Sequence, residues 1–220
     1  MKKKFLSIVL ALSMLCAFVP LVASAATSGT CGENVTWTLD EDGTLTISGT
    51  GDMDSSDFSR YDIKSVIIEN SVTSIGDYTF SGCVNLTSIT IPDSVTSIGN
   101  HAFDFCLDLP SIKLSSNLTS IGDQAFYQCK KLTSITIPSS VTSIGEFAFY
   151  ECIGLTSINV DKYNPKYCSV NGNVFSKDKT ELIEYASGKT EKSYIVPNGV
   201  TSIGVQAFSC CKLTSIKLSN

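Results

Sequence analysis

Residues 72–94 read VTSIGDYTFSGCVNLTSITIPDS, and the chain repeats this pattern several times. New units begin at Val95, Leu118 and Val141, each 23 residues after the one before, and another begins at Val200. The last interval is 59 residues, so one unit carries an insertion of 36 residues. Self-similarity at a fixed period of this length is the sequence signature of a solenoid, in which each repeat packs only on its neighbours.

The apolar residues of a unit indicate how the chain runs within it. Counted from the first residue of each unit as offset 0, they fall at offsets 0, 3, 8, 11, 14, 17 and 19. This is neither a helical period nor a sustained alternation, so the apolar side chains converge only if each unit bends into a coil. The Leu-x-x-Ile-x-Ile stretch predicts a β-strand, which Pro92, Pro138 and Pro197 end, and the glycine at offset 4 predicts a tight turn. We therefore predict a β-rich solenoid of 23-residue coils.

Two segments depart from the repeat, and both predict β-hairpins. Residues 35–39 and 44–47 alternate polar and apolar side chains around the turn sequence DEDG at 40–43, so residues 26–62 are interpreted as an N-terminal cap hairpin and lead-in. The solenoid then occupies residues 63–220. Its insertion, at about 161–190, contains the apolar segments 174–175 and 182–185 and turn sequences at 164–165 and 171–172. A second hairpin that protrudes from one enlarged coil is the predicted structure.

Residues 1–25 have the features of a secretory signal peptide. Three lysines at positions 2–4 precede an apolar run over 5–22, and this run ends in the small-residue cleavage sequence Ala23-Ser24-Ala25. Ser7 and Ser13 interrupt the run, which makes a retained membrane anchor the weaker alternative. We expect a secreted or cell-surface protein, with no membrane insertion after the signal is cleaved.

The composition of the remaining chain limits its partners and its redox chemistry. It contains 13 basic and 21 acidic residues, a net charge of −8, which argues against nucleic-acid and anionic-membrane partners. Five of its eight cysteines lie at offset 11: Cys83, Cys106, Cys129, Cys152 and Cys211. Parallel stacking points their Cβ atoms the same way, so we predict a buried, reduced column rather than disulfides or a redox or metal ladder. Cys31, Cys168 and Cys210 lie off the column and are left free to pair or to react.

The repeat pattern is specific enough to indicate a family. Leu-x-x-Ile-x-Ile-Pro-x-x-Val-Thr-x-Ile-Gly-x-x-Ala-Phe-x-x-Cys resembles the BspA-like, treponemal-type leucine-rich repeat across residues 63–220. The segment CGENVTWTLDEDGTLTISGTG at 31–51 also resembles the one that usually follows the signal peptide in that family. The resemblance implies a bacterial exported or surface protein that binds other molecules, often in adhesion to host or neighbouring cells. It implies no reaction and no shared set of binding residues.

The sequence contains no recognisable catalytic or metal-binding motif. Gly-x-Ser-x-Gly is absent, the single histidine His101 has no flanking motif, and Gly49-Thr-Gly51 lacks the rest of a dinucleotide fingerprint. The DEDG turn lacks the carboxylate spacing of a calcium loop, and no Cys-x-x-Cys pair or Cys/His cluster could hold zinc. We therefore expect no enzymatic activity, no cofactor and no metal.

Positions that vary between otherwise uniform coils are the candidate binding residues. On the outward side of the strand, at offset 18, they are Thr90, Lys113, Thr136 and Asn159. Around the cysteine turn, they are aromatic side chains that the core pattern does not require: Tyr78, Phe105, Tyr127, Phe147 and Tyr150. Such aromatics are effective anchors for proteins or sugars. The alternative is that these rings pack locally over the turn or on the next coil.

Three functions follow as hypotheses. The first is a binding protein for an extracellular protein or glycan, because a stacked sheet offers a long repetitive surface. The second is a structural spacer or display module for another domain, and the third, more remote, is a secreted hydrolase. The last unit completes its strand at Leu218 with nothing polar folded over it, so we also expect the natural product to continue past Asn220 or the chain to self-associate end to end.

Overall fold

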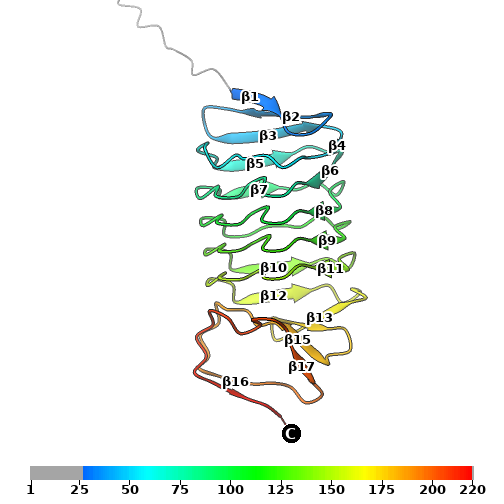
Figure 1. Ribbon diagram of the computed structural model, residues 1–220, viewed down its shortest axis with the longest axis vertical. Helices are drawn as coiled ribbons and strands as arrows, with labels where there is room; N and C mark the ends of the chain where they lie inside the picture. The colour runs from blue at the N-terminus through cyan, green and yellow to red at the C-terminus, as the bar shows by residue number, and fades with distance from the viewer. Residues whose placement is uncertain (1–26, 220) are drawn as a thin grey trace, which may run out of the picture.

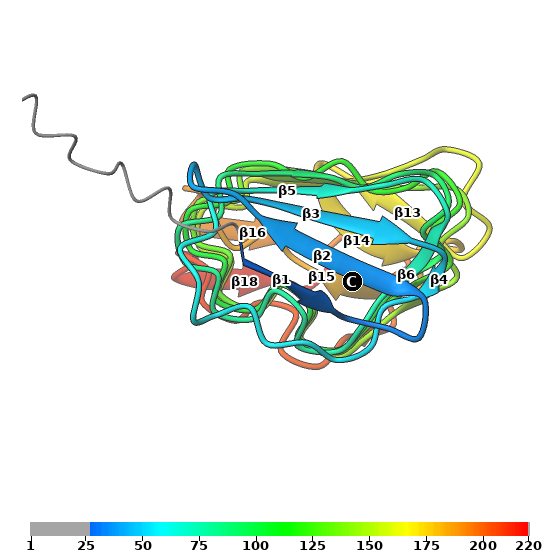
Figure 2. The same cartoon turned by 90° about the horizontal axis from the view of Figure 1, so that it is seen from above.

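The computed structural model describes residues 27–219, which form a β-solenoid (Figure 1). Eighteen strands and no helix make up this part of the chain. The coils stack along one axis, and viewed along that axis they largely superimpose (Figure 2), so equivalent residues of successive units lie over one another. The predicted fold class is confirmed. The predicted signal peptide lies outside the described residues.

The predicted strands at offsets 16–19 are present in every coil but that of Val95, and they pair in parallel. They are β5 (Ser65–Ile68), β7 (Ser88–Thr90), β10 (Ser134–Ile137), β12 (Ser157–Val160), β16 (Ser193–Ile195) and β18 (Ser215–Lys217). Pairs such as Ser65 with Ser88, and Ser134 with Ser157, are in register at one repeat length. The sequence period therefore sets the strand register, because a slip of one residue would turn every buried side chain outward.

A second parallel ladder runs along the start of each unit. It contains β4 (Gly51–Asp52), β6 (Val72–Ile75), β8 (Ser97–Ile98), β9 (Ser120–Ile121) and β11 (Ser143–Ile144). These strands are only two to four residues long, and the sequence interpretation assigned this stretch inward-facing residues but no strand. The regular coils thus contribute short strands to two parallel sheets rather than to one.

Pro110 explains a break in the first ladder. At this offset the other coils carry threonine, whose N–H donates to the preceding coil, as Thr87 N does to Lys64 O at 2.9 Å. Proline has no N–H to donate. Around Ser111 only an isolated bridge to Ser134 remains, and β7 and β10 fall in separate sheets.

The core is a continuous apolar column inside the coils. The offset-8 phenylalanines from Phe80 to Phe149 are fully buried or nearly so and stack face to face, with centroids 5.3 Å apart for both Phe80–Phe103 and Phe103–Phe126. The glycine at offset 4 allows the backbones to approach closely, because a Cβ on Gly122 would lie 2.5 Å from the carbonyl carbon of Gly99. Any side chain there would force adjacent coils apart.

The N-terminal hairpin is confirmed and is larger than predicted. Its strands are β2 (Val35–Leu39) and β3 (Thr44–Gly49), and a further strand, β1 (Thr27–Thr30), pairs antiparallel with β2. β3 pairs in parallel with β5, so this sheet continues directly into the solenoid. Trp37 packs edge-on against Phe58 at 5.5 Å and covers the first core layer.

The inserted hairpin is confirmed, but the expectation that it protrudes is wrong. β14 (Asn173–Ser176) and β15 (Glu181–Glu184) form the predicted pair, β13 (Tyr167–Val170) extends it, and β15 pairs in parallel with β17 (Ser202–Ile203). The apolar side chains of Val174, Phe175 and Leu182 are buried. The insertion therefore replaces a layer of the stack, because these side chains require a core on which to pack.

Candidate functional site

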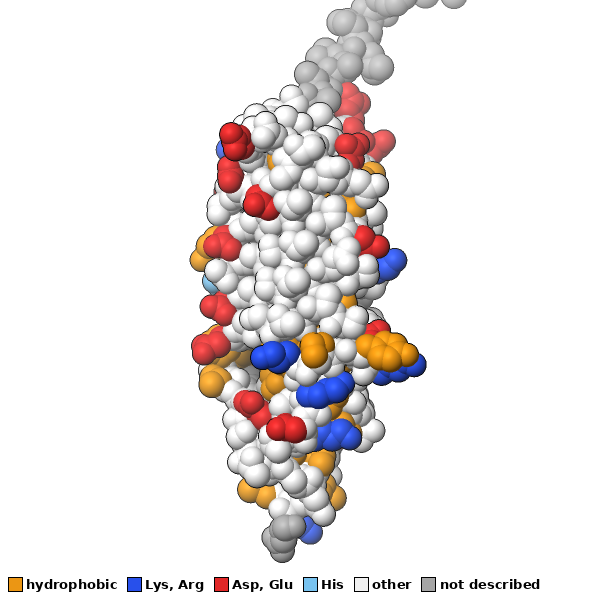
Figure 3. Space-filling model, turned by 90° about the vertical axis from the view of Figure 1, so that its right-hand side faces the viewer, with side chains coloured by type: hydrophobic (Ala, Val, Ile, Leu, Met, Phe, Trp, Pro, Cys, Tyr) orange, Lys and Arg blue, Asp and Glu red, His pale blue; other side chains and the backbone are white. Residues whose placement is uncertain are grey.

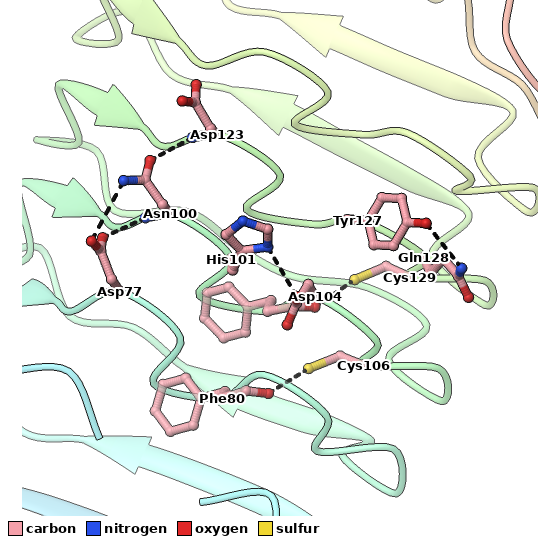
Figure 4. A network of polar contacts seen from close by, with 11 residues as sticks. Asp77, Phe80, Asn100, His101, Asp104, Cys106, Asp123, Tyr127, Gln128 and Cys129 are labelled. Carbon is pink, nitrogen blue, oxygen red and sulfur yellow. Dashed lines mark hydrogen bonds and ion pairs between the residues drawn. The ribbon is translucent and has the colours of Figure 1, made fainter. Parts of the chain in front are cut away.

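The cysteine column is structural. The thiols of Cys106, Cys129 and Cys152 are fully buried, and each donates to the carbonyl oxygen of a phenylalanine in the preceding coil, at 3.0–3.3 Å. Figure 4 shows two of these contacts. Burial raises the pKa of the Cys83 thiol to about 12 and that of Cys129 well above its ordinary value, so these groups stay protonated and unreactive. Cys211 departs from the prediction, because it is only half-buried.

The three cysteines off the column are also free thiols and differ in access. Cys31 is buried, and burial followed by the nearby Asp54 raises its pKa to about 11. Cys168 is half-buried, whereas Cys210 is exposed. Among the described cysteines, Cys210 is thus the most accessible to a reagent.

Four of the five predicted aromatic residues lie together on the cysteine turn. Tyr127 and Tyr150 stack at 5.6 Å, Phe105 meets Tyr127 edge-on at 5.3 Å, and Phe147 meets Tyr150 edge-on at 5.8 Å. We call these four residues the aromatic band. Phe105 is 39% exposed, and the other three are partly exposed. The four rings therefore do pack on neighbouring coils, which was the alternative considered from the sequence. This packing still leaves part of each ring exposed to solvent.

The fifth aromatic residue lies in a separate cluster. Tyr78 is 51% exposed and stacks on the imidazole of His101 at 4.5 Å. The His101 Nδ1 atom lies 3.0 Å from Oδ2 of the buried Asp104, while Oδ1 of Asp104 has no hydrogen-bond partner among the described residues (Figure 4). Among those residues no serine or cysteine is hydrogen-bonded to His101, so the pair lacks the nucleophile of a catalytic triad in this geometry.

Several of these aromatic residues have a left-handed backbone conformation. A non-glycine residue with positive φ occupies offset 6 in the four coils that begin at residues 72 to 141 and in the coil of Val200. Most of these coils have a second such residue at offset 10. Three are bulky aromatics: Tyr78 (57°), Phe105 (55°) and Phe147 (57°). This region favours glycine and asparagine, and a bulky side chain there is costly. Neither the core nor the turn therefore requires aromatic residues at these positions.

The predicted strand-face residues are all exposed, but they do not form one site. Lys113 and Thr136 line a shallow groove of about 410 Å³ together with Pro138 and Asp161, next to the break caused by Pro110. Thr90 lines a separate hollow with Glu69 and Pro92. Asn159 accepts a hydrogen bond from the Ser157 hydroxyl at 3.0 Å.

The sequence interpretation missed a cavity where the insertion meets the regular stack. In earlier coils, N–H groups at offsets 6, 8 and 10 donate to the next coil, as Phe103 N does to Ala125 O at 2.8 Å. At the equivalent Phe147 and Phe149 no such bond is present among the described residues, because β15 pairs with β17 and not with β11. A cavity of about 150 Å³ lies there. Glu184 lines it, and burial raises the pKa of its carboxyl to about 8.

The repeat and its stacking define the class of protein. The model of the BspA type leucine-rich repeat region matches residues 52–181 and 161–220 in six copies, and the chain belongs to this family. This family is a repeat scaffold. No helix capable of crossing a bilayer occurs in the described part of the chain.

Solved structures show the same fold in bacterial proteins. A leucine-rich repeat protein from Eubacterium ventriosum is 26% identical, with a TM-score of 0.69, over 87% of this chain and 62% of that one. A leucine-rich repeat protein from Bacteroides ovatus is 25% identical, with a TM-score of 0.51, over 86% and 64%. The pneumococcal vaccine antigen PcpA is 22% identical, with a TM-score of 0.52, over 88% and 65%. The chain thus spans less than two thirds of each of these proteins, and no curated protein matches it at a significant level.

Proposed function

We propose that this chain is an exported repeat protein that binds an extracellular macromolecule, a protein or a glycan, through the aromatic band. The observation that carries the proposal is the grouping of Phe105, Tyr127, Phe147 and Tyr150 across neighbouring coils with ring surface open to solvent. Clustered aromatic side chains provide a large contact area with little loss of conformational entropy on binding. The left-handed backbone at Phe105 and Phe147 supports the proposal, because a repeat under structural selection alone would favour smaller residues there.

Export and adhesion are parts of the same proposal. The N-terminal sequence has the pattern of a signal peptide, and the family resemblance implies surface proteins that attach cells to hosts or neighbours. A solenoid suits this role because stacking extends one surface over several coils without a larger core.

The test is a binding screen followed by paired variants. The predicted mature chain from Ala26 is applied to arrays of matrix proteins and glycans, and the affinity of each hit is measured for Tyr127→Ala/Tyr150→Ala and for Lys113→Ala/Thr136→Ala. We expect a loss of about tenfold or more for the aromatic variant, the size typical of truncating two interface anchors. Thr36→Ala/Thr38→Ala, at exposed positions of the N-terminal sheet, is the matched control. If the aromatic variant melts like the wild type and binds every hit unchanged, the aromatic band is not the site. If no ligand is retained on any array, the spacer hypothesis is favoured instead.

A further inference from the structure

Charge is distributed unevenly along the solenoid. Residues 27–161 contain five basic and seventeen acidic side chains, a net charge of −12, whereas residues 162–219 contain eight basic and four acidic ones, a net charge of +4. On the side of the molecule drawn in Figure 3, acidic groups predominate near the N-terminal coils and lysines gather lower down, at the level of the insertion. An anionic partner would therefore be repelled by one part of the stack and attracted to the other.

The insertion brings several of these lysines together. Lys166 and Lys177 continue the β13–β14 pair, with Lys177 N donating to Lys166 O at 2.8 Å. The Lys177 ammonium reaches the carbonyl oxygen of Lys162 at 3.1 Å. Lys179 follows in the turn after β14, where its N–H donates to Ser176 O at 2.9 Å. We call Lys162, Lys166, Lys177 and Lys179 the lysine patch.

The ammonium groups of the lysine patch form no ion pair among the described residues. The ion pairs among the described residues are His101–Asp104 and Lys131–Asp108, and neither involves the patch. The nearby Asp178 carboxylate accepts from the Ser176 and Thr180 hydroxyls, and these bonds together with the Thr180 N–H lower its pKa, so it stays ionised and offsets part of the charge of Lys177 and Lys179 without forming an ion pair with either. Like charges placed opposite each other across a hairpin are destabilising. Fold stability therefore does not explain this arrangement, whereas a negatively charged ligand would.

An exposed aromatic ring lies beside the lysines. Tyr163 is 75% exposed, and the Lys162 ammonium lies 4.7 Å from its ring centre. A flat ring next to ammonium groups can contact the apolar face of a sugar while the lysines hold its acidic substituents. A stiff nucleic-acid duplex, which carries a charge about every 1.7 Å, would run on to the acidic coils next to the patch.

We propose that the lysine patch and Tyr163 form a binding site for an acidic polysaccharide, one that bears sulfate or carboxylate groups. The site consists of inserted residues, which differ from the rest of the repeat, and it does not include the aromatic band. The two proposals are therefore independent, and a negative result for one leaves the other unchanged.

Heparin is the probe for the test, and its affinity is measured at several salt concentrations. The patch variant is Lys162→Gln/Lys166→Gln/Lys177→Gln, and the control variant is Lys64→Gln/Lys130→Gln/Lys131→Gln, which removes the same charge from exposed positions outside the insertion. We expect the patch variant to bind at least tenfold more weakly in low salt, with the slope of log affinity against log salt reduced by about two to three. The control should lose less than threefold, and Tyr163→Ala should weaken binding without changing the slope.

Each remaining outcome overturns one part of the inference. Equal losses in the two lysine variants would show attraction by overall charge and not by a site. Duplex DNA or anionic lipid vesicles bound as tightly as heparin would remove the assignment to polysaccharide. Loss of heparin binding in Tyr127→Ala/Tyr150→Ala, with the patch variant unaffected, would move the site to the aromatic band.

Discussion

Replacing Glu184 with glutamine should stabilise the protein at neutral and alkaline pH. The Glu184 carboxyl lines the cavity between the coil of Val141 and the insertion, and no hydrogen bond to it is present among the described residues. Burial raises its pKa from 4.5 to about 8, so the folded chain retains a proton that the unfolded chain has lost. Glutamine keeps the shape of the neutral form and does not ionise.

The direction and the size of the effect follow from proton linkage. Between pH 4.5 and pH 8 the folded state binds more protons than the unfolded state, so the free energy of unfolding falls as the pH rises, by at most about 1.36 kcal/mol per pH unit. Glu184 is partly exposed, so solvent and relaxation reduce this effect. We expect Glu184→Gln to gain about 1–2 kcal/mol at pH 8 and close to nothing at pH 4, which corresponds to a rise in Tm of roughly 2–8 °C at pH 8.

Urea and thermal unfolding followed by circular dichroism at pH 4, 6 and 8 measure this difference. Glu41→Gln, in an exposed turn of the N-terminal sheet, is the matched control and should not change the pH dependence. A gain of the same size for Glu184→Gln at pH 4 and pH 8 would refute the reasoning, because it would show an effect of packing and not of ionisation.

Two further predictions concern the stack itself. Gly122→Ala should destabilise the protein by about 1–3 kcal/mol in urea unfolding, because its Cβ would lie 2.5 Å from the Gly99 backbone. The control Ser139→Ala, at an exposed position, should be neutral in the same assay. An unchanged urea midpoint for Gly122→Ala would show that adjacent coils can move apart without cost. A soluble aromatic disulfide reagent should label Cys210 rapidly in the native protein and label Cys106, Cys129 and Cys152 only after unfolding, since these three thiols are buried. Mass spectrometry of the labelled peptides checks the assignment, and native disulfides joining Cys83 to Cys106 or Cys129 to Cys152 would contradict the column packing.

The sequence by itself determined the solenoid, its period and most of its core. A 23-residue repeat with apolar side chains at fixed offsets has one compact solution, in which equivalent residues of successive coils stack. For the same reason the sequence predicted the buried cysteines at offset 11 and the strand that ends at Pro92. It also predicted both hairpins, because their turn residues lie between alternating apolar segments.

Only the tertiary structure decided the features that depend on contacts between distant segments. The short second ladder has strands of two to four residues, too brief to give a periodic signal, and it forms because neighbouring coils supply its hydrogen bonds. The inserted hairpin packs on the stack because Val174 lies in the same apolar core as the coil of Val141, and Phe175 and Leu182 are buried as well. The cavity at Glu184 and the contact of the Lys177 ammonium with Lys162 likewise join residues from separate turns of the chain. Their spacing in sequence carries no information about distance, because packing between layers fixes it.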